Sequence, residues 1–431
     1  NLNIIIFKEA SPGYENEPGI ILQGHMDMVA VKDADCNKDM VKEPLDLFIE
    51  NGKIGARGTS LGADDGIMVA YALALLESDT VSHPKLTVII TTEEETGMDG
   101  AGGIDLSMVE ASKLINLDSE KEGEMIAGCA GGARFTGVLE GSLSKGKGVC
   151  FNVTVKGLLG GHSGNLIHLE RGNACFLMAR LLTEVKNVSP VRLVSFKGGV
   201  ADNAIPDRCE ASFIAGEKDI DAVKEALDYF KQSVSAELET KDKDFDLTVE
   251  CKENAEELSL DEETTGKFAA YLYTMPNGVI ANSMDVPGLV ETSLNLGQVK
   301  VENGNLEAVY LVRSNIDSAK KALLDRMMVL TKVFGGKGSI RGNYPGWKYK
   351  VNSPLRDKMV RIYRDFYGSK PMVCAIHAGL ECGILGSKLK DPDCVSIGPD
   401  IMDIHSPMER LDIESAKRVW EYLLLVLKEK G

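Results

Sequence analysis

The sequence predicts an α/β protein in which a mixed, mostly parallel sheet with helices on both faces is interrupted by an inserted domain. Strand and helix patterns alternate in the first third of the chain, change character near residue 149 and return near residue 343. A chain of 431 residues is also too long to fold around one hydrophobic core, so two domains are expected. We therefore predict a first domain made of residues 1–147 and 338–431, with the inserted domain at 148–337.

The first part of the chain alternates between short apolar strands and helices. Strands are predicted at 1–10, 19–29, 85–95 and 111–120, with an alanine-rich helix at 64–78. Strands separated by helices are typical of parallel sheets, whose ligands bind at the carboxyl ends of the strands. Polar residues at those ends are therefore the first candidates for a functional site.

The inserted segment has the pattern of an α+β domain with two lobes. Apolar and polar residues alternate from Val149 onward, as they do in antiparallel strands that have one solvated face. Two successive sets follow: strands at 149–157 and 208–216 with helices at 171–185 and 222–241, then strands at 246–254, 293–304 and 306–315 with helices at 263–275 and 319–335. After the insertion, the α/β pattern resumes with helices at 355–368 and 414–430 and strands at 372–376 and 394–398.

The composition excludes several classes of protein. With 65 acidic and 48 basic residues the formal net charge is −17, which argues against a nucleic-acid or anionic-membrane partner and suits a protein that binds cations. The nine cysteines form no CxxC pair, which is typical of reduced thiols rather than a disulfide framework. No apolar run approaches the roughly 18 residues of a membrane span. We expect a soluble cytoplasmic protein.

Acidic residues and histidines follow the predicted strands of the α/β part. They are His25 and Asp27, Asp64 and Asp65, Glu93, Glu94 and Glu95, Asp118, and His405 near the end of the chain. Three adjacent carboxylates after a buried strand repel one another unless a cation neutralises them. Taken alone, an HxD, a DDG or an EEE segment is more often a cap, a turn or a solvated loop. The conjunction of all of them on one predicted sheet favours a metal site.

The number of these ligands favours two metal ions over one. Zinc binds imidazole nitrogen and carboxylate oxygen in near-tetrahedral sites. Two histidines and three carboxylates exceed the needs of one open catalytic zinc, whereas they suit two ions about 3.5–4 Å apart with one aspartate between them. One carboxylate then remains free as a general base. Manganese or cobalt suits the same ligands.

The order HxD, GADDG, EExG, LDS and a C-terminal HSP resembles the family of di-zinc exopeptidases that includes aminoacylase and carboxypeptidase G. The segments "LQGHMDMV", "GGHSG", "YPGW" and "HAGLECG" resemble its branch of Xaa-His dipeptidases, and the resemblance runs from about Ile4 to Ile413. Members of that branch carry an additional N-terminal segment, so we expect one to be missing here. They also often have Asn at the position of Asp65, a difference we expect to be harmless.

The resemblance implies a role for each metal-site residue. It assigns His25 and Asp118 to one zinc, His405 and Glu95 to the other, and Asp64 to both, with a cis peptide bond after Asp64. It further implies that Asp27 orients the His25 ring and that Glu94 is the general base. Glu93 matches no functional position and is expected to be a solvated carboxylate.

Substrate-binding residues are expected mainly in the inserted domain, which the resemblance implies is a lid. His162 in "GGHSG" is implied to stabilise the oxyanion, either within one chain or from a dimer partner. A free substrate carboxylate calls for arginine, and Arg313 is the candidate, with Arg171 and Arg208 as alternatives. The remaining candidates are Asn203 through its amide, Glu381 as partner of the substrate ammonium group, and Gly379 in the approach to it; His168 and His377 have no comparable support.

The resemblance implies a dipeptidase that hydrolyses Xaa-His and other unblocked dipeptides as a monomer or homodimer. The alternative on the same fold is an N-acyl-amino-acid deacylase or desuccinylase, which needs no partner for an ammonium group. A third hypothesis, a non-catalytic metal-binding or peptide-binding protein, is disfavoured because a binder has no need of a base such as Glu94 beside its ligands.

Overall fold

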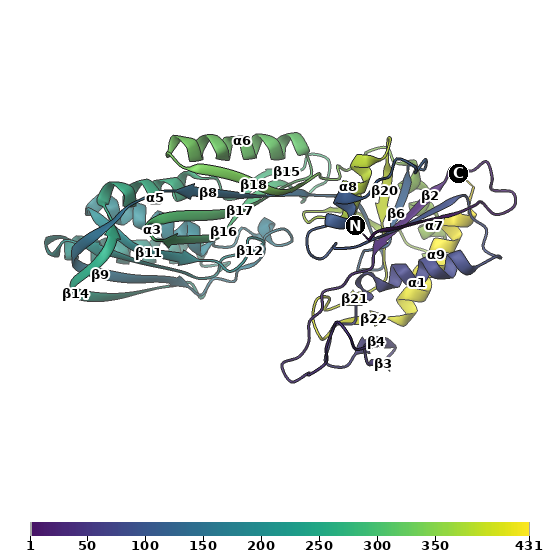
Figure 1. Cartoon of the computed structure of the whole chain (residues 1–431), viewed down its shortest axis with the longest axis horizontal. Helices are drawn as coiled ribbons and strands as arrows, with labels where there is room; N and C mark the ends of the chain where they lie inside the picture. Colours follow the sequence, from purple (N-terminus) through teal and green to yellow (C-terminus); the bar gives the residue numbers. More distant parts are fainter. Residues whose placement is uncertain (1, 431) are drawn as a thin grey trace. The chain divides into compact units, whose positions relative to one another are not determined.

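The computed structural model describes residues 2–430 and divides into two compact units (Figure 1). Unit 1 comprises Asn1–Cys129 and Tyr344–Gly431, and unit 2 comprises Ala130–Asn343. The insertion predicted at 148–337 lies inside unit 2, which also takes in the strand residues just before and after it. Within residues 2–430, no helix combines the length and the apolar character needed to cross a membrane.

A seven-stranded sheet forms the centre of unit 1, and the prediction of a mixed, mostly parallel sheet is confirmed. Its order is β1 (Ile4–Lys8), β5 (Leu86–Thr91), β2 (Ile20–His25), β6 (Lys113–Asn116), β20 (Asp393–Ser396), β7 (Glu124–Cys129) and β19 (Met372–Ile376). Strands β5, β2, β6 and β20 are parallel, as are β7 and β19. Strand β1 is antiparallel to β5, and β7 is antiparallel to β20.

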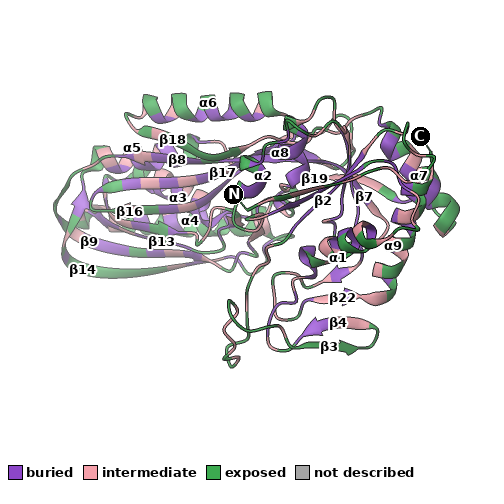
Figure 2. Cartoon of the chain, turned by 45° about the vertical axis from the view of Figure 1, so that its right-hand side comes forward, coloured by how far each residue is buried: buried purple, intermediate pink, exposed green. Residues whose placement is uncertain are grey.

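Helices cover both faces of this sheet. Side chains alternate along a strand, so Ile20 and Leu22 of β2 face one side and Ile21 faces the other. The first side packs against α1 (Ala63–Glu77), α7 (Pro354–Tyr367) and α9 (Ile413–Lys428), and the second against α2 (Asp99–Gly103) and α8 (Glu381–Lys388). All residues of β2 (Figure 2) and of β5 are consequently buried.

A small four-stranded sheet accompanies the main sheet of unit 1. Its order is β21 (Ile401–Met402), β22 (Arg410–Asp412), β4 (Lys53–Ala56) and β3 (Leu47–Glu50), with antiparallel pairing throughout. The loop between β21 and β22 contains His405, and β4 precedes the segment that leads into α1. This sheet therefore holds two distant parts of the chain that both contribute to the site described below.

Unit 2 is built on a nine-stranded sheet. The order is β14 (Asp246–Leu260), β9 (Leu143–Lys156), β13 (Cys209–Ala215), β11 (Val191–Gly198), β16 (Val290–Glu302), β17 (Asn305–Ser314), β8 (Gly131–Leu139) and β18 (Lys337–Tyr344), and β15 (Gly278–Asn282) also pairs with β16. The two predicted α+β sets are interleaved in it, because β14, predicted in the second set, pairs with β9 of the first from Asp246–Lys156 to Leu260–Leu143. Strand β11, which lies outside both predicted sets, pairs with β16 of the second set through Lys197 with Lys300 and Gly198 with Val299.

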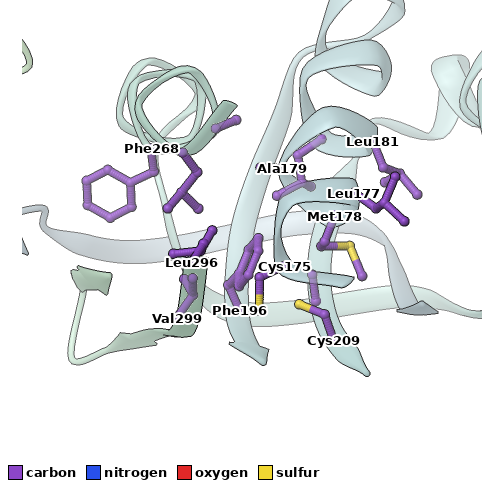
Figure 3. Close-up of a cluster of buried hydrophobic side chains, with 14 of the residues drawn as sticks. Cys175, Leu177, Met178, Ala179, Leu181, Phe196, Cys209, Phe268, Leu296 and Val299 are labelled. Carbon is purple, nitrogen blue, oxygen red and sulfur yellow. The ribbon is translucent and has the colours of Figure 1, made fainter. Parts of the chain in front are cut away.

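Helices pack on the sheet of unit 2 to form its core. They are α3 (Ala174–Val188), α4 (Ile220–Leu238), α5 (Glu262–Thr274) and α6 (Asp317–Val333), with short 3₁₀ turns at Ile167–Leu169 and Glu217–Asp219. Cys175 and Met178 of α3 point toward Phe196 of β11 and Cys209 of β13 (Figure 3). All nine cysteines are free thiols, as the sequence predicts.

Candidate metal centre

The predicted metal ligands converge in unit 1. Strand β2 ends at His25, Glu94 and Glu95 follow β5, and Asp118 follows β6. These three strands are parallel neighbours, so their carboxyl ends lie at one edge of the sheet. Asp64 reaches this edge from the first turn of α1, and His405 from the loop between β21 and β22.

The carboxylate of Asp64 lies between two imidazole rings. Its Oδ1 atom is 3.0 Å from Nε2 of His25, and its Oδ2 atom is 3.2 Å from Nε2 of His405. Each ring has a second carboxylate beside the same nitrogen: Asp118 Oδ1 lies 3.3 Å from His25, and Glu95 Oε2 lies 3.0 Å from His405. The five residues therefore form two donor sets that share Asp64. The peptide bond between Asp64 and Asp65 is cis.

The spacing of these donors fits a metal ion in each set. A ring nitrogen donates one hydrogen, yet each Nε2 atom faces two carboxylate oxygens within 3.3 Å. Ligands bound to tetrahedral zinc at about 2.0–2.1 Å lie about 3.4 Å from one another, close to these separations. The Oε1 atom of Glu95 is also buried and has no hydrogen-bond partner among the described residues. Imidazole and carboxylate are, moreover, ligands that zinc accepts.

Protons take the place of cations when no metal is bound. Burial opposes a charge on His25, but hydrogen bonds to Asp118 and Asp64 outweigh it and hold the pKa of His25 well above its ordinary range. Hydrogen bonds to Asp64 and Glu95 raise the pKa of His405 to about 10. Burial favours neutral Asp64, yet hydrogen bonds from both rings keep the pKa of this carboxyl well below its usual range. Metal binding must therefore release protons from the rings.

Glu94 lies outside both donor sets, but the charges of Asp118, His25 and Glu95 act on it. Burial, followed by the charge of Asp118, raises the pKa of Glu94 to about 9 in the metal-free protein, although the charge on His25 opposes this. A nearby cation favours the charged form of a carboxyl group, so metal binding lowers this pKa. A carboxyl group whose pKa changes in this way can take up or release a proton when metals bind.

Asp27 contacts the site in two ways. Its backbone oxygen is 2.9 Å from Nδ1 of His25, whereas its carboxylate is 3.6 Å from the same atom. The carboxylate oxygens instead accept hydrogen bonds from the backbone N–H groups of Glu94, at 3.2 Å, and Glu95, at 3.1 Å. The contact with the His25 ring thus involves the main chain of Asp27, and the side chain of Asp27 anchors the loop that carries Glu94 and Glu95.

Two acidic residues at the site have contacts that the sequence analysis missed. Asp65 is buried, its Oδ2 atom accepts from the backbone N–H of His25 at 3.3 Å, and burial raises its pKa well above the ordinary range. Glu409 is also buried, and its carboxylate accepts from consecutive backbone N–H groups before and at Asp64. The available signal for Glu409 was an acidic residue four positions after His405 in "HSPMER".

Glu381 is the first residue of α8 and is fully buried. Its Oε2 atom accepts hydrogen bonds from Nε2 of Gln23, at 2.5 Å, and from the hydroxyl of Thr91, at 2.6 Å. Its Oε1 atom has no hydrogen-bond partner within the described chain, and burial raises the pKa of Glu381 to about 7. A Cβ atom on Gly379, just before α8, would lie 2.6 Å from the terminal methyl group of Met98 and 2.8 Å from the hydroxyl of Tyr344, so these side chains would have to shift.

The predicted substrate residues of unit 2 include His162, which is partly buried, and Arg313, which is buried. Nδ1 of His162 accepts hydrogen bonds from the backbone N–H groups of Gly164, at 3.3 Å, and Asn165, at 3.1 Å. The hydrogen of this ring therefore lies on Nε2. Burial, followed by the positive charge of Arg313, lowers the pKa of His162 to about 4, so the ring is neutral near pH 7.

The other candidates of unit 2 have different environments. Arg313 is 6% exposed, whereas Arg208 is exposed and paired with Glu210 at 2.8 Å. Arg171 donates to the backbone oxygen of Gly160 at 2.6 Å and so braces the loop before His162. The remaining candidates are an exposed Asn203, whose backbone oxygen accepts from Ser163 N–H, and an exposed His168; in unit 1, His377 is buried and Glu93 is exposed.

The metal-free protein should become less stable as the pH rises from 7 to 9. Glu94, His25 and His405 all bind protons more tightly when folded than when unfolded, so their stabilisation is complete at low pH and is lost as the pH rises toward the folded pKa values. His162 acts oppositely, but only below its ordinary pKa of 6.5. We expect the thermal midpoint of chelator-treated protein to fall by several degrees over this range, whereas zinc-loaded protein should show little change. A rising midpoint would contradict the assigned electrostatics.

Known proteins resemble this chain over nearly its whole length. The model of peptidase family M20/M25/M40 matches residues 21–429. Cytosol non-specific dipeptidase from Escherichia coli (strain K12) is 40% identical over 429 residues, which cover 99% of this chain and 88% of that protein. The crystal structure of aminoacylhistidine dipeptidase from Vibrio alginolyticus superposes with a TM-score of 0.91 at 35% identity, over 100% of this chain and 88% of that one. Aminopeptidase PepT from Bacillus cereus shares the fold, with a TM-score of 0.52, 16% identity and coverage of 99% and 84%.

Proposed function

The chain belongs to peptidase family M20/M25/M40, and we propose that it is a dipeptidase that hydrolyses unblocked dipeptides, Xaa-His dipeptides among them, at a two-metal centre. One observation carries the proposal: the two oxygens of Asp64 face His25 and His405 separately, each ring with its own second carboxylate. The similarity to a cytosol non-specific dipeptidase and to an aminoacylhistidine dipeptidase supports the substrate class and a cytoplasmic location.

His25, Asp118 and Asp64 would hold one metal ion, and His405, Glu95 and Asp64 the other. Zinc suits these donors best, and manganese or cobalt are substitutes. Bound metals supply Lewis acidity and lower the pKa of water toward neutrality. The separation of the donors into two sets with one shared carboxylate supports two ions rather than one.

Glu94 is the proposed general base. It takes a proton from the attacking water and returns it to the nitrogen of the leaving amino acid. Hydrogen bonds from the backbone of Glu94 and Glu95 to the carboxylate of Asp27 hold this loop in place. Asp27 therefore acts as a positioning residue for the base, in addition to its backbone contact with the His25 ring.

His162 and Arg313 are the proposed anion-binding residues of the substrate site. A neutral ring with its hydrogen on Nε2 can donate to a developing oxyanion without being charged itself. The buried guanidinium of Arg313 suits a substrate carboxylate, because arginine binds carboxylates through two parallel hydrogen bonds. The contacts of Arg171 and Arg208 with other groups favour Arg313 for this role. Asn203 is proposed to assist through its amide.

Glu381 is proposed to bind the ammonium group that distinguishes a free dipeptide from an acylated amino acid. One carboxylate oxygen already accepts from Gln23 and Thr91, and the other is unpartnered within residues 2–430. A buried acceptor without a partner is costly, so a cationic substrate group would satisfy it. The small residue Gly379 keeps the chain before Glu381 free of side-chain bulk.

The test compares free with acylated substrates and counts metals in the same sample. β-Ala-His, a panel of Xaa-His dipeptides and an N-acetylated amino acid are incubated with the protein, with and without added zinc. We expect two metals per chain and hydrolysis of the free dipeptides alone, because only they carry an ammonium group for Glu381. Cleavage restricted to the acylated substrate would assign a deacylase. Folded, metal-supplied protein that binds no metal and cleaves nothing would overturn the proposal.

A further inference from the structure

We infer that Glu409 is a positioning residue of the metal centre: its carboxylate fixes the segment that carries Asp64 relative to the loop that carries His405. Glu409 itself is not a ligand of either donor set. It lies four residues after His405, and it contacts the chain some 350 residues earlier, just before Asp64. The inference rests on the two-metal centre proposed above and adds a residue to it.

The carboxylate of Glu409 accepts hydrogen bonds from four consecutive backbone N–H groups. Its Oε2 atom accepts from the backbone N–H groups of Leu61, at 2.7 Å, and Gly62, at 2.9 Å. Its Oε1 atom accepts from Ala63, at 2.8 Å, and more weakly from Asp64, at 3.4 Å. The residue is 2% exposed, so these bonds are not in competition with water. A carboxylate that accepts several backbone bonds in a buried place is held in one geometry.

The first turn of α1 explains why a charged side chain is needed there. The first N–H groups of a helix have no partner inside the helix, and they favour a negative charge. Gly62, which precedes α1, provides no side-chain cap, and the backbone at Asp64 and Asp65 departs from helical angles. Glu409 supplies the missing acceptors from a distant part of the chain. The position of Asp64 therefore depends on this carboxylate.

The His405 loop also depends on a fixed anchor. Asp403 and His405 both have positive φ angles, of 52° and 58°, a region that residues other than glycine seldom occupy. Such conformations persist where surrounding contacts determine them. The hydroxyl of Ser406 donates to the backbone oxygen of Asp403 within the loop, while Glu409 ties the end of the loop to α1. Asp64 Oδ2 and His405 Nε2 lie 3.2 Å apart across this connection.

Removal of the Glu409 hydrogen bonds should weaken metal binding at one donor set more than at the other. His25 and Asp118 stand at the ends of neighbouring strands of the central sheet, so their geometry does not need Glu409. His405 is placed by its loop alone. Residues that orient metal ligands typically change metal affinity about 10–100-fold when they are replaced. When Glu409 is replaced, we therefore expect the metal affinity of the donor set that contains His405 to fall by that factor. The affinity of the other donor set should change much less.

The experiment titrates metal-free protein with Zn²⁺ alone and uses Glu409→Gln, which keeps the size of the side chain but sets an NH₂ group against backbone donors. The matched control is Asp393→Asn, because Asp393 is another buried carboxylate that accepts from a helix start, at Leu355 of α7, yet it contacts no metal ligand. If Glu409→Gln does not fold, Glu409→Asp is used under the same criteria. Hydrogen exchange of the amides at 61–63 is measured in the metal-free state.

We expect wild-type protein and Asp393→Asn to bind two Zn²⁺ ions with similar affinities. Glu409→Gln should bind one ion normally and the second about 10–100-fold more weakly, with faster exchange at 61–63. Two sites of wild-type affinity in Glu409→Gln, or an equal loss in Asp393→Asn, would overturn the inference while the two-metal centre stands. Wild-type protein that fails to bind two ions would instead overturn the proposed function.

Discussion

Replacement of Glu94 by glutamine should lower kcat by about 10²–10⁴-fold and leave two metals bound per chain, because general-base catalysis contributes a factor of that size. The amide is nearly the same size as the carboxylate but cannot take a proton from water. Glu94 also lies outside both donor sets, so the metal ligands keep their contacts. The measurement is steady-state hydrolysis of β-Ala-His together with metal analysis of the same preparation.

Glu93→Gln is the control for this prediction. Glu93 is adjacent in sequence and carries the same charge, but it is exposed and belongs to neither donor set. We expect its kcat to match that of the wild type. Unchanged kcat in Glu94→Gln would remove Glu94 as the base, and loss of a metal from that variant would make it a ligand instead.

The pattern of the sequence predicted the central sheet because buried parallel strands are recognisable by composition. Ile20–Leu22 and Val88–Ile90 form apolar runs, and both faces of those strands are indeed covered. The ligands at the carboxyl ends of β2, β5 and β6 follow from the same rule. His405 was grouped with them on the same expectation, but it lies in a loop of the small four-stranded sheet and not at the end of a central strand.

Long-range hydrogen bonds to the backbone were the part that could not be predicted. Glu409 accepts from N–H groups at 61–64, and Asp27 accepts from those of Glu94 and Glu95. Every residue of a loop offers the same backbone donor, so a sequence pattern does not tell which carboxylate each one meets. Side chains that bind metals are different, because their residue types already restrict the partner.

In unit 2, too, the sequence predicted the elements but not their partners. The nine-stranded sheet joins the two predicted α+β sets, because β14 of the second set pairs with β9 of the first. Alternation of apolar and polar residues predicts a strand with one buried face, but it does not name the neighbouring strand. The strands of the two sets were therefore visible in the sequence, and their union into one sheet was not.

Replacement of Asp64 by asparagine should reduce the metal content from two ions per chain toward one and lower kcat by about 10³-fold or more. The two oxygens of Asp64 face different imidazoles, at 3.0 Å and 3.2 Å. An asparagine side chain has one oxygen that can bind a metal and an NH₂ group that cannot, so one donor set loses a ligand. Metals contribute several kcal/mol of transition-state stabilisation, and about 1.4 kcal/mol corresponds to each tenfold change in rate.

The control for Asp64→Asn is Asp105→Asn, which changes the same charge at an exposed aspartate outside both donor sets. It should retain two metals and full activity, which separates loss of a ligand from loss of negative charge on an acidic protein. Metal content then separates the two variants: Glu94→Gln should lose turnover but keep its metals, whereas Asp64→Asn should lose turnover together with metal. If Asp64→Asn kept both metals at wild-type affinity, Asp64 would not be shared between the sets. The two histidines would then belong to independent sites, and the mechanism would have to place Glu94 beside only one of them.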